Sequence, residues 1–477
     1  MQRLLTQVPG LDEILHGGLP LYSTVLICGG PGSGKTVLAH QIVFRNASPS
    51  RKALFVSTIS EPLARILLYG QQFDFFDPNL IGEAVHYEDI GPDLLAGNGT
   101  RAIERVETLL LEQRPAFLVI DSVRALSAVS DSPATVRRML YRLSALVATL
   151  PCHTLLVGEY GVDEFASTVE ASIVDAILVL NRRLSSTYDQ RTLRVAKLRG
   201  SDYLPGEHTF RISAQGITVF PRFVTPPTAT AYTPVRERAP SGIPGLDEML
   251  RGGLLRGTTT LLAGDPGIGK TVTALHFLLN GVRQGEPGVY ISFQEDPSQL
   301  IQIARNFGFD IDSLLQSGRL ILLYASPVEL DIDEHAQKML AAIQAVQAKR
   351  VVIDSIGDLE AGAHGDANRY LHFVYSLVQW LKTHQITALM TAEMGDLFGS
   401  ELTLTGRGIS HVADALILMR YTEIDGEIRR ALAVLATRGS DHSKEVREYL
   451  ICEPQGPQVG APLHSAFSIL LPTQRKE

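Results

Sequence analysis

The chain has 477 residues, and 43 Lys plus Arg against 51 Asp plus Glu give it a formal net charge of −8. Hydrophobic residues make up 45% and charged residues 20%, which is typical of a globular protein and excludes a largely disordered one. The acidic balance also argues against a protein whose main partner is nucleic acid.

The cellular compartment is indicated by the spacing of the cysteines and by the length of the apolar segments. Cys28, Cys152 and Cys452 lie far apart, which suits a reducing cytoplasm and offers no disulfide framework. No apolar run approaches the roughly 18 residues of a membrane span. The opening MQRLLTQVPGLDEIL lacks the apolar core of a signal peptide. We therefore expect a cytoplasmic protein without a membrane segment.

One segment occurs twice along the chain. Residues 8–36 read VPGLDEILHGGLPLYSTVLICGGPGSGKT, and residues 243–271 read IPGLDEMLRGGLLRGTTTLLAGDPGIGKT. A repeat near half the chain length predicts two homologous domains rather than a solenoid of short units. We place these domains at residues 1–222 and 236–477. Residues 223–235 between them are rich in Pro and Thr and lack a helical or strand period, so they predict an extended linker.

Each half alternates short apolar segments with longer amphipathic ones. In the first half the expected strands are STVLICG, KALFVST, AFLVIDS, HTLLVGE and AILVLN, and TVLAHQIVFRNA and TRAIERVETLLLEQ are expected helices. Strands with few polar residues, separated by helices, predict an α/β fold with a mostly parallel sheet covered on both faces. Two later segments, RTLRVAKLR and HTFRISAQGITVF, predict an antiparallel extension of that sheet.

A phosphate-binding loop follows the first strand of each half. GGPGSGKT at 29–36 and GDPGIGKT at 264–271 match GxxxxGK[ST] between a strand and a helix. The glycines let backbone N–H groups point at phosphate oxygens, and the lysine reaches the β- and γ-phosphates. The candidate ATP contacts in the two loops are Gly30, Gly32, Ser33, Gly34, Lys35 and Thr36, and Gly267, Ile268, Gly269, Lys270 and Thr271.

A Mg²⁺ ion is expected beside each loop. The hydroxyls of Thr36 and Thr271 are candidate ligands, because this loop position holds the metal of a bound nucleotide. Asp121 and Asp354 end the apolar segments FLVID and RVVID, so they are expected at strand tips, where a carboxylate can hold the metal directly or through water. The alternative is a solvated or helix-capping aspartate.

Hydrolysis of ATP also needs a group that orients or deprotonates water. In the second half Gln294 and Glu295 follow the strand in GVYISFQEDP, and Glu295 is a candidate base and metal-shell ligand. In the first half Ile59 and Ser60 occupy these positions, and Glu61 is shifted by one place. The second site therefore has one candidate base, and the first has none in register. A solvated surface glutamate is the alternative for Glu295.

Taken together, these motifs resemble the KaiC-type ATPases of the RecA superfamily. The resemblance rests on the tandem PGLDE and GxPGxGKT segments, the Asp-Ser strand ends, and KLRGS at 197–201 with ATRGS at 436–440, and it covers nearly the whole chain. It implies two tandem RecA-like P-loop NTPase domains. It also implies a homohexamer that holds ATP between neighbouring subunits.

The resemblance further implies roles for single residues. A Lys-x-Arg pair of the family reaches across the subunit boundary to the γ-phosphate, and here it matches Lys197 and Arg199. The second half has alanine at the lysine position and keeps only Arg438. Arg430 matches a nucleotide-contacting arginine, and Phe307 matches an aromatic residue near the adenine. For the basic residues, a solvated strand edge is the alternative.

The resemblance also raises the question of autophosphorylation. The clock protein of this family phosphorylates an adjacent Ser-Thr pair in its second domain, and the matching stretch here reads Ser410-His411. Ser410 is therefore the candidate phosphoacceptor, and a two-site cycle is not expected. A polar helix or turn residue is the alternative for Ser410.

The leading hypothesis is a regulatory ring that binds ATP twice per chain, hydrolyses it slowly and signals to an unidentified protein partner. In this hypothesis the first half binds ATP tightly and holds the ring together, and the second half carries the candidate base. Three alternatives stay open: a RecA/RadA-type DNA-dependent ATPase, a serine/threonine autokinase, and a nucleotide-dependent scaffold with little turnover.

Overall fold

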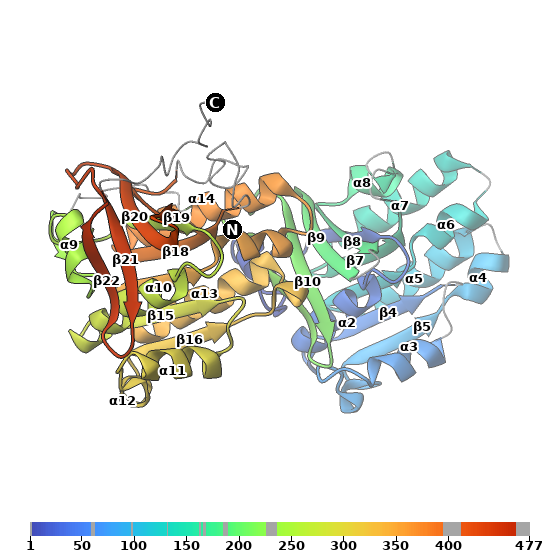
Figure 1. The fold of residues 1–477 in the computed structure, drawn as a ribbon. Coiled ribbons are helices and arrows are strands. Elements are labelled where there is room, and N and C mark those ends of the chain that lie inside the picture. Colours follow the sequence, from blue (N-terminus) through green and yellow to red (C-terminus); the bar gives the residue numbers. More distant parts are fainter. Residues whose placement is uncertain are drawn as a thin grey trace, which may run out of the picture. The chain divides into compact units, whose positions relative to one another are not determined.

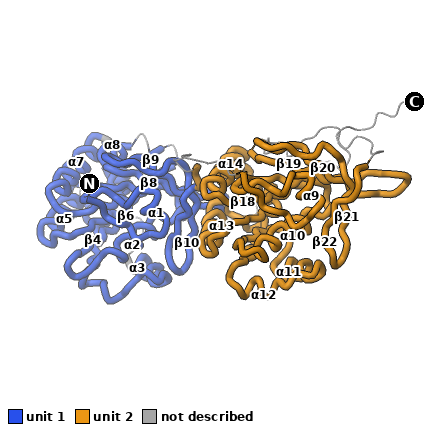
Figure 2. The backbone as a smooth tube through the Cα atoms, turned by 90° about the vertical axis from the view of Figure 1, so that its left-hand side faces the viewer, with its two compact units in different colours: residues 1–222 blue, residues 223–477 orange. Residues whose placement is uncertain are grey.

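The structure, a computed structural model, describes residues 2–58, 63–96, 99–130, 132–161, 164–165, 168–184, 189–225, 236–394 and 412–463. The chain separates into two compact units, residues 1–222 and 223–477 (Figures 1 and 2). Each unit contains a nine-stranded, mostly parallel sheet flanked by helices, as expected for tandem RecA-like α/β domains. The predicted fold class is confirmed. None of the described helices is long and apolar enough to cross a membrane.

The sheet of the first unit has the order β11-β10-β9-β8-β3-β7-β6-β4-β5. Its parallel strands are β3 (Thr24–Gly29), β4 (Ala53–Ser57), β5 (Val85–Asp89), β6 (Phe117–Asp121), β7 (His153–Glu159) and β8 (Ala176–Leu184). The antiparallel extension is β9 (Asp189–Leu198), β10 (Glu207–Ser213) and β11 (Gly216–Phe220). Every strand expected above is present. Strand β5 has no apolar run because it forms the half-exposed edge of the sheet.

Helices cover both faces of this sheet because its central strands are apolar on both sides. Along β3, Val25 and Ile27 belong to one hydrophobic cluster, and Leu26 and Cys28 belong to another. The helices are α1 (Leu11–Ile14), α2 (Lys35–Asn46), α3 (Leu63–Gly70), α4 (Gly91–Ala96), α5 (Thr100–Gln113), α6 (Arg124–Val129), α7 (Pro133–Val147) and α8 (Val169–Ile173). A short ribbon pairs β1 (Arg3–Leu4) with β2 (Leu19–Pro20).

The second unit repeats this plan in the order β16-β15-β17-β18-β14-β19-β20-β21-β22. Its strands are β14 (Thr259–Gly264), β15 (Gly288–Ser292), β16 (Leu320–Tyr324), β17 (Arg350–Asp354), β18 (Thr387–Glu393), β19 (Ala415–Ile424), β20 (Glu427–Thr437), β21 (Val446–Cys452) and β22 (Gly456–Pro462). Its helices are α9 (Pro244–Met249), α10 (Lys270–Arg283), α11 (Pro297–Asn306), α12 (Ile311–Gln316), α13 (Ile332–Val346) and α14 (Ala367–Thr383). Its short ribbon is β12 (Arg238–Ala239) with β13 (Leu254–Leu255).

The start of the predicted linker packs within the second unit. The Phe223 ring lies 5.7 Å from the Phe373 ring of α14, and the Thr225 and Ser376 hydroxyls are 3.0 Å apart. Residues 226–235, the rest of that linker, lie outside the described residues.

A buried ion pair stabilises the second unit and provides a stability prediction. Arg350, fully buried at the start of β17, donates from Nε to Glu286 at 2.5 Å and from Nη1 to the Pro240 carbonyl at 2.8 Å. We expect Glu286→Gln to lower the free energy of unfolding by about 3–5 kcal/mol, because it leaves a buried guanidinium without its counter-charge. Urea unfolding followed by the fluorescence of Trp380, the single tryptophan, measures this change in the second unit.

The matched control is Glu237→Gln. Glu237 is 78% exposed and lies 3.7 Å from Arg256, so its loss should cost less than about 1 kcal/mol. If the two substitutions lowered the free energy of unfolding equally, the buried pair would not stabilise the unit more than the exposed pair does.

Buried histidines make the fold sensitive to acid. Burial lowers the pKa of His40, on α2, and of His276, on α10, from 6.5 to about 4. Between these values the unfolded chain takes up protons that the folded chain does not, so stability falls as the pH drops from about 6.5 toward 4. The loss is at most about 3.4 kcal/mol for each histidine. Thermal unfolding at pH 7.5 and pH 5 should show a flatter pH dependence in His40→Gln and His276→Gln than in the unmodified chain.

Candidate functional site

The two phosphate-binding loops have the curled backbone that their glycines allow. Gly34 and Gly269, which directly precede the lysines, have φ values of +99° and +110°. A Cβ atom at Gly34 would lie 2.8 Å from Ile212 Cδ1, and one at Gly269 would lie 2.5 Å from Ile451 Cδ1. The positive φ therefore favours glycine at both positions, and a Cβ atom would also displace an isoleucine methyl group. Helices α2 and α10 begin at the next residue, so their N-termini face the loops.

The loop lysines are largely buried and contact the loop backbone. The Lys35 Nζ donates to the Gly30 carbonyl at 2.8 Å, and the Lys270 Nζ donates to the Gly264 and Asp265 carbonyls at 3.1 and 3.0 Å. Burial lowers the pKa of both lysines, whereas nearby carboxylates act in the opposite direction. An anionic phosphate at this position would offset the burial and stabilise each ammonium group.

Each loop threonine contacts the aspartate predicted at the strand tip. The Thr36 hydroxyl donates to Asp121 Oδ2 at 2.7 Å, and the Thr271 hydroxyl donates to Asp354 Oδ2 at 2.8 Å. A hydroxyl and a carboxylate side by side are hard oxygen donors of the kind Mg²⁺ prefers, so these pairs fit the expected metal. Among the described residues, no group of three or more His, Cys, Asp or Glu could hold a metal ion. Phosphate oxygens of a nucleotide and water molecules would complete the shell.

A cavity of about 710 Å³ connects these groups in the first unit. Its lining includes Gly32, Gly34, Lys35, Thr36 and Asp121, all of which were predicted as site residues. Arg65 and Arg124 also line it, and sequence reasoning missed both because neither belongs to a motif. The positive charge of Arg65 suits an anionic ligand, whereas Arg124 is paired with Glu164 at 2.8 Å.

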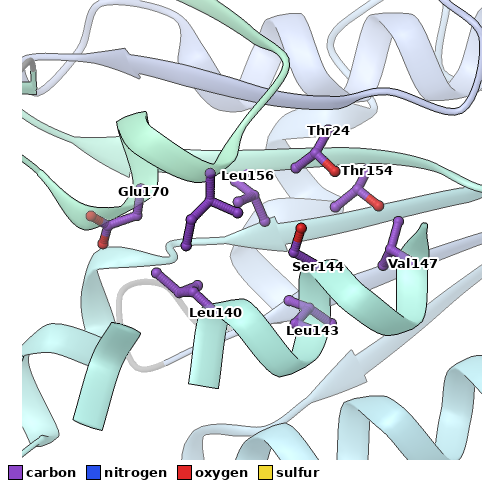
Figure 3. A pocket seen from close by; sticks show the side chains of 9 residues that line it. Thr24, Leu140, Leu143, Ser144, Val147, Thr154, Leu156 and Glu170 are labelled. Carbon is purple, nitrogen blue, oxygen red and sulfur yellow. The ribbon is translucent and has the colours of Figure 1, made fainter. Parts of the chain in front are cut away.

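A separate cavity in the first unit has a different character. It measures about 10 Å³, lies between α7 and β7 and is lined mainly by apolar atoms, including Leu140, Leu143 and Leu156 (Figure 3). Its polar lining includes Thr154 and the buried Glu170. A volume of this size holds about one water molecule, so this cavity does not compete with the loop as a ligand site.

Glu295, the candidate base, lies beside the second loop. Its Oε1 is 3.5 Å from the Thr271 hydroxyl, and burial, followed by the charge of Asp354, raises the pKa of its carboxyl group. A raised pKa makes this carboxylate a better proton acceptor. Gln294 is exposed, and its amide donates to Asp358 at 3.3 Å. The matching Ile59 and Ser60 of the first half lie outside the described residues.

Two glutamates near the lysines were missed by the sequence reasoning. Glu159 ends β7, and its Oε1 lies 3.9 Å from Lys35 Nζ. Glu393 ends β18, the equivalent strand, and its charge acts on Lys270. Both strands pair with the strand that leads into the loop. The matching ends of LLVGE and LMTAE were a signal that could have identified them.

Comparison with known proteins accounts for the repetition of this site. A model of the KaiC ATPase family matches residues 4–223 and again residues 239–463. The chain belongs to the KaiC family of ATPases. The circadian clock oscillator protein KaiC of Rippkaea orientalis is 31% identical over 96% of this chain and 89% of its own. KaiC 1 of Synechocystis sp. shows the same identity and coverage, and KaiC of Parathermosynechococcus lividus is 32% identical over 94% of this chain and 83% of its own.

The KaiC-type cations Lys197 and Arg199 lie away from the phosphate-binding loop of their own unit. Lys197 is the strand partner of Ile177, and Ile177 is in turn the partner of Leu26 near the start of β3. The Arg199 backbone N–H donates to the Asp175 carbonyl, which lies beside Thr24. The loop begins at the other end of β3, about 10–16 Å farther along the strand direction. The Lys197 Nζ donates to the Ala171 carbonyl at 2.9 Å.

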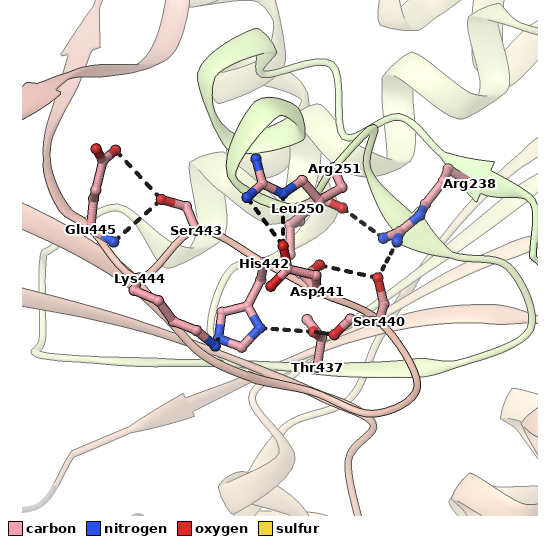
Figure 4. A network of polar contacts seen from close by, with 10 residues as sticks. All are labelled: Arg238, Leu250, Arg251, Thr437, Ser440, Asp441, His442, Ser443, Lys444 and Glu445. Atoms are coloured by element: carbon pink, nitrogen blue, oxygen red, sulfur yellow. Dashed lines mark hydrogen bonds and ion pairs between the residues drawn. The ribbon is translucent and has the colours of Figure 1, made fainter.

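The KaiC-type arginines of the second unit lie at opposite ends of the sheet. The Arg438 N–H donates to the Asp414 carbonyl at the start of β19, the end away from the loop. Arg430 instead pairs with Tyr421, beyond the end of β14, on the side of the loop. Arg238 stabilises the turn after Arg438, because it donates to the Ser440 hydroxyl and, at 2.6 Å, to the Leu250 carbonyl (Figure 4).

The remaining residues implied by the resemblance are Phe307 and Ser410. Phe307 follows α11, and its ring lies edge-on to the His276 ring of α10 at 5.8 Å between centroids. His276 is six residues beyond Lys270, about 9 Å along the helix. Ser410 lies outside the described residues. Ser33 and Ile268 occupy equivalent loop positions and are buried, and their backbone N–H groups donate to the Gly30 and Asp265 carbonyls, each at 3.3 Å.

Proposed function

We propose that this KaiC-family ATPase is a regulatory ring that binds Mg-ATP at two sites per chain, hydrolyses it slowly and signals to a protein partner. One observation carries the proposal: Arg199 and Arg438 lie at the end of each sheet opposite its own phosphate-binding loop. At that distance neither arginine serves the site of its own unit. This distance supports our proposal that each arginine serves the site of a neighbouring subunit in a ring.

The chemistry at each site follows from the contacts around the loop. Loop amides and the helix N-terminus bind the phosphates, and Lys35 or Lys270 neutralises their charge. Thr36 with Asp121, and Thr271 with Asp354, would hold Mg²⁺, which neutralises charge on the phosphate oxygens when it is bound.

Slow turnover follows from the groups that differ between the two sites. Glu295 can accept a proton from the attacking water at the second site, but this site has alanine where the family has the lysine of its Lys-x-Arg pair. Loss of a cation at the developing phosphoryl charge can cost about 10³–10⁵ in rate, as for an arginine finger. The first site keeps Lys197 and Arg199 and has no glutamate in register with Glu295. We therefore assign ATP-dependent assembly to the first site and most of the turnover to the second.

A protein partner fits the composition better than DNA does. The net charge of −8 opposes binding to a polyanion. The relatives reported above are circadian clock oscillator proteins. We propose the regulatory role for this chain and not the clock, because fold similarity does not transfer a pathway.

Light scattering with and without Mg-ATP tests the proposal, with phosphate release assayed on the same samples. We expect a mass of about six subunits with ATP, and slow phosphate release. A chain that stays monomeric with ATP would overturn the ring and the roles assigned to Lys197, Arg199 and Arg438. Phosphate release that rises on addition of single-stranded DNA would favour the DNA-dependent ATPase instead.

Mixing two inactive variants tests the shared site directly. Lys270→Ala lacks the loop lysine, and Arg438→Ala lacks the proposed trans cation. In mixed rings, some interfaces join an intact loop to an intact arginine, so part of the phosphate release should return. No recovery in mixed hexamers would show that Arg438 acts within its own chain or has no role.

A further inference from the structure

Three hydroxyl groups donate hydrogen bonds to the carboxylate of Asp354. The Tyr290 hydroxyl donates to Oδ2 at 2.6 Å, and the Thr271 hydroxyl donates to the same oxygen at 2.8 Å. The Thr391 hydroxyl donates to the other oxygen, Oδ1. Tyr290 and Thr391 are fully buried, and Asp354 is 6% exposed. Both oxygens of a nearly buried carboxylate are therefore held by side chains from β15, β18 and the loop.

The first unit has a different arrangement at the same register. In the second unit, Tyr290 lies two residues before the serine of β15 that pairs with Asp354. In the first unit, Phe55 lies two residues before the serine of β4 that pairs with Asp121, so Phe55 is the counterpart of Tyr290. Val157 of β7 occupies the position of Thr391 in β18. Neither Phe55 nor Val157 has a hydroxyl group, so the two donors of the second unit have no counterpart at these positions.

These donors can restrain the carboxylate while the loop threonine binds a metal. A hydroxyl can coordinate Mg²⁺ through an oxygen lone pair and still donate its proton to Asp354. The Tyr290 hydroxyl then keeps Oδ2 from turning, and the Thr391 hydroxyl keeps Oδ1 from turning. Hydrogen bonds to a charged group at a buried position are among the stronger ones.

We propose that Tyr290 and Thr391 are positioning residues that hold the Asp354 carboxylate ready for the metal of the bound nucleotide. The inference rests on the proposed nucleotide site of the second unit. It adds that nucleotide binding at the second site depends on the metal through these two hydroxyl groups.

The test compares the affinity for a fluorescent ADP analogue in Mg²⁺ and in EDTA. The full-length chain carries Lys35→Ala, so that binding reports the second site. Tyr290→Phe and Thr391→Val introduce the residues that the first unit has at these positions. We expect each substitution to raise the dissociation constant in Mg²⁺ about tenfold, the effect of losing one hydrogen bond to a charged group, and to leave the value in EDTA unchanged.

Tyr449→Phe is the matched control. Tyr449 is also fully buried in the second unit, and its hydroxyl lies 2.6 Å from the Thr273 hydroxyl on α10, away from Asp354. Removal of the Tyr449 hydroxyl should change the dissociation constant of the analogue by the same factor in Mg²⁺ and in EDTA. Thermal unfolding of each variant shows whether it is folded, and Thr391→Val carries the test if Tyr290→Phe does not fold.

Two results would overturn the inference and one would overturn its basis. An unchanged affinity in Mg²⁺, or equal losses in Mg²⁺ and EDTA, would mean that these hydroxyls only satisfy buried polar atoms. No binding of the analogue to the Lys35→Ala chain in Mg²⁺ would instead overturn the proposed nucleotide site of the second unit.

Discussion

Lys270→Ala is expected to remove most of the phosphate release of the full-length protein, by a factor of about 10² or more. The Lys270 Nζ lies among the loop carbonyls of the site that also contains Glu295, and its replacement removes the loop cation at that site. Lys35→Ala removes the equivalent cation at the first site, which has no glutamate in register with Glu295. We therefore expect Lys35→Ala to reduce ATP-dependent assembly more than phosphate release per assembled chain.

Light scattering and phosphate release on the same samples separate these two effects. Lys52→Ala and Lys349→Ala are the controls, because both lysines are exposed and precede the strands β4 and β17 at the ends away from the loops. Equal losses of phosphate release in Lys35→Ala and Lys270→Ala would contradict the division of labour. A larger loss in Lys35→Ala would reverse it.

Glu295→Gln is expected to lower turnover by about 10²–10⁴ while leaving ATP binding nearly unchanged. The amide keeps the size of the side chain and its contact near Thr271, but it cannot accept a proton. Burial and the Asp354 charge raise the pKa of Glu295. The rate of the unmodified enzyme should therefore rise with pH as Glu295 loses its proton, at a pH above the ordinary pKa of a glutamate. That rise should be absent in Glu295→Gln.

Single-turnover phosphate release and nucleotide binding, measured across pH, distinguish this role from others. Glu329→Gln, at an exposed position, should change neither quantity. Should Glu295→Gln weaken ATP binding as strongly as turnover, Glu295 would act mainly through the metal shell. A full rate in Glu295→Gln would make it the solvated glutamate of the alternative hypothesis.

Local patterns were sufficient to predict the fold and the positions of the loop and strand-tip residues in each half. The two GxxxxGK[ST] segments predicted strand, loop and helix, because glycine conformation and helix initiation depend on neighbouring residues. Asp121 and Asp354 were predicted at strand tips because an apolar run ends at each of them, and they contact Thr36 and Thr271. The half-exposed strand β5 was missed because a hydrophobic pattern reveals only buried segments, and an edge strand buries few side chains.

The sequence by itself therefore determined the tandem α/β architecture, the family, the Lys and Thr residues of both loops, and the Asp residue at the neighbouring strand tip. Tertiary structure alone decided that Glu159 lies near Lys35 and that Tyr290 and Thr391 hold Asp354. It also decided that Arg199 and Arg438 lie at the far end of each sheet. These relations join residues dozens to hundreds of positions apart, and they depend on strand order and register, which local periodicity does not encode.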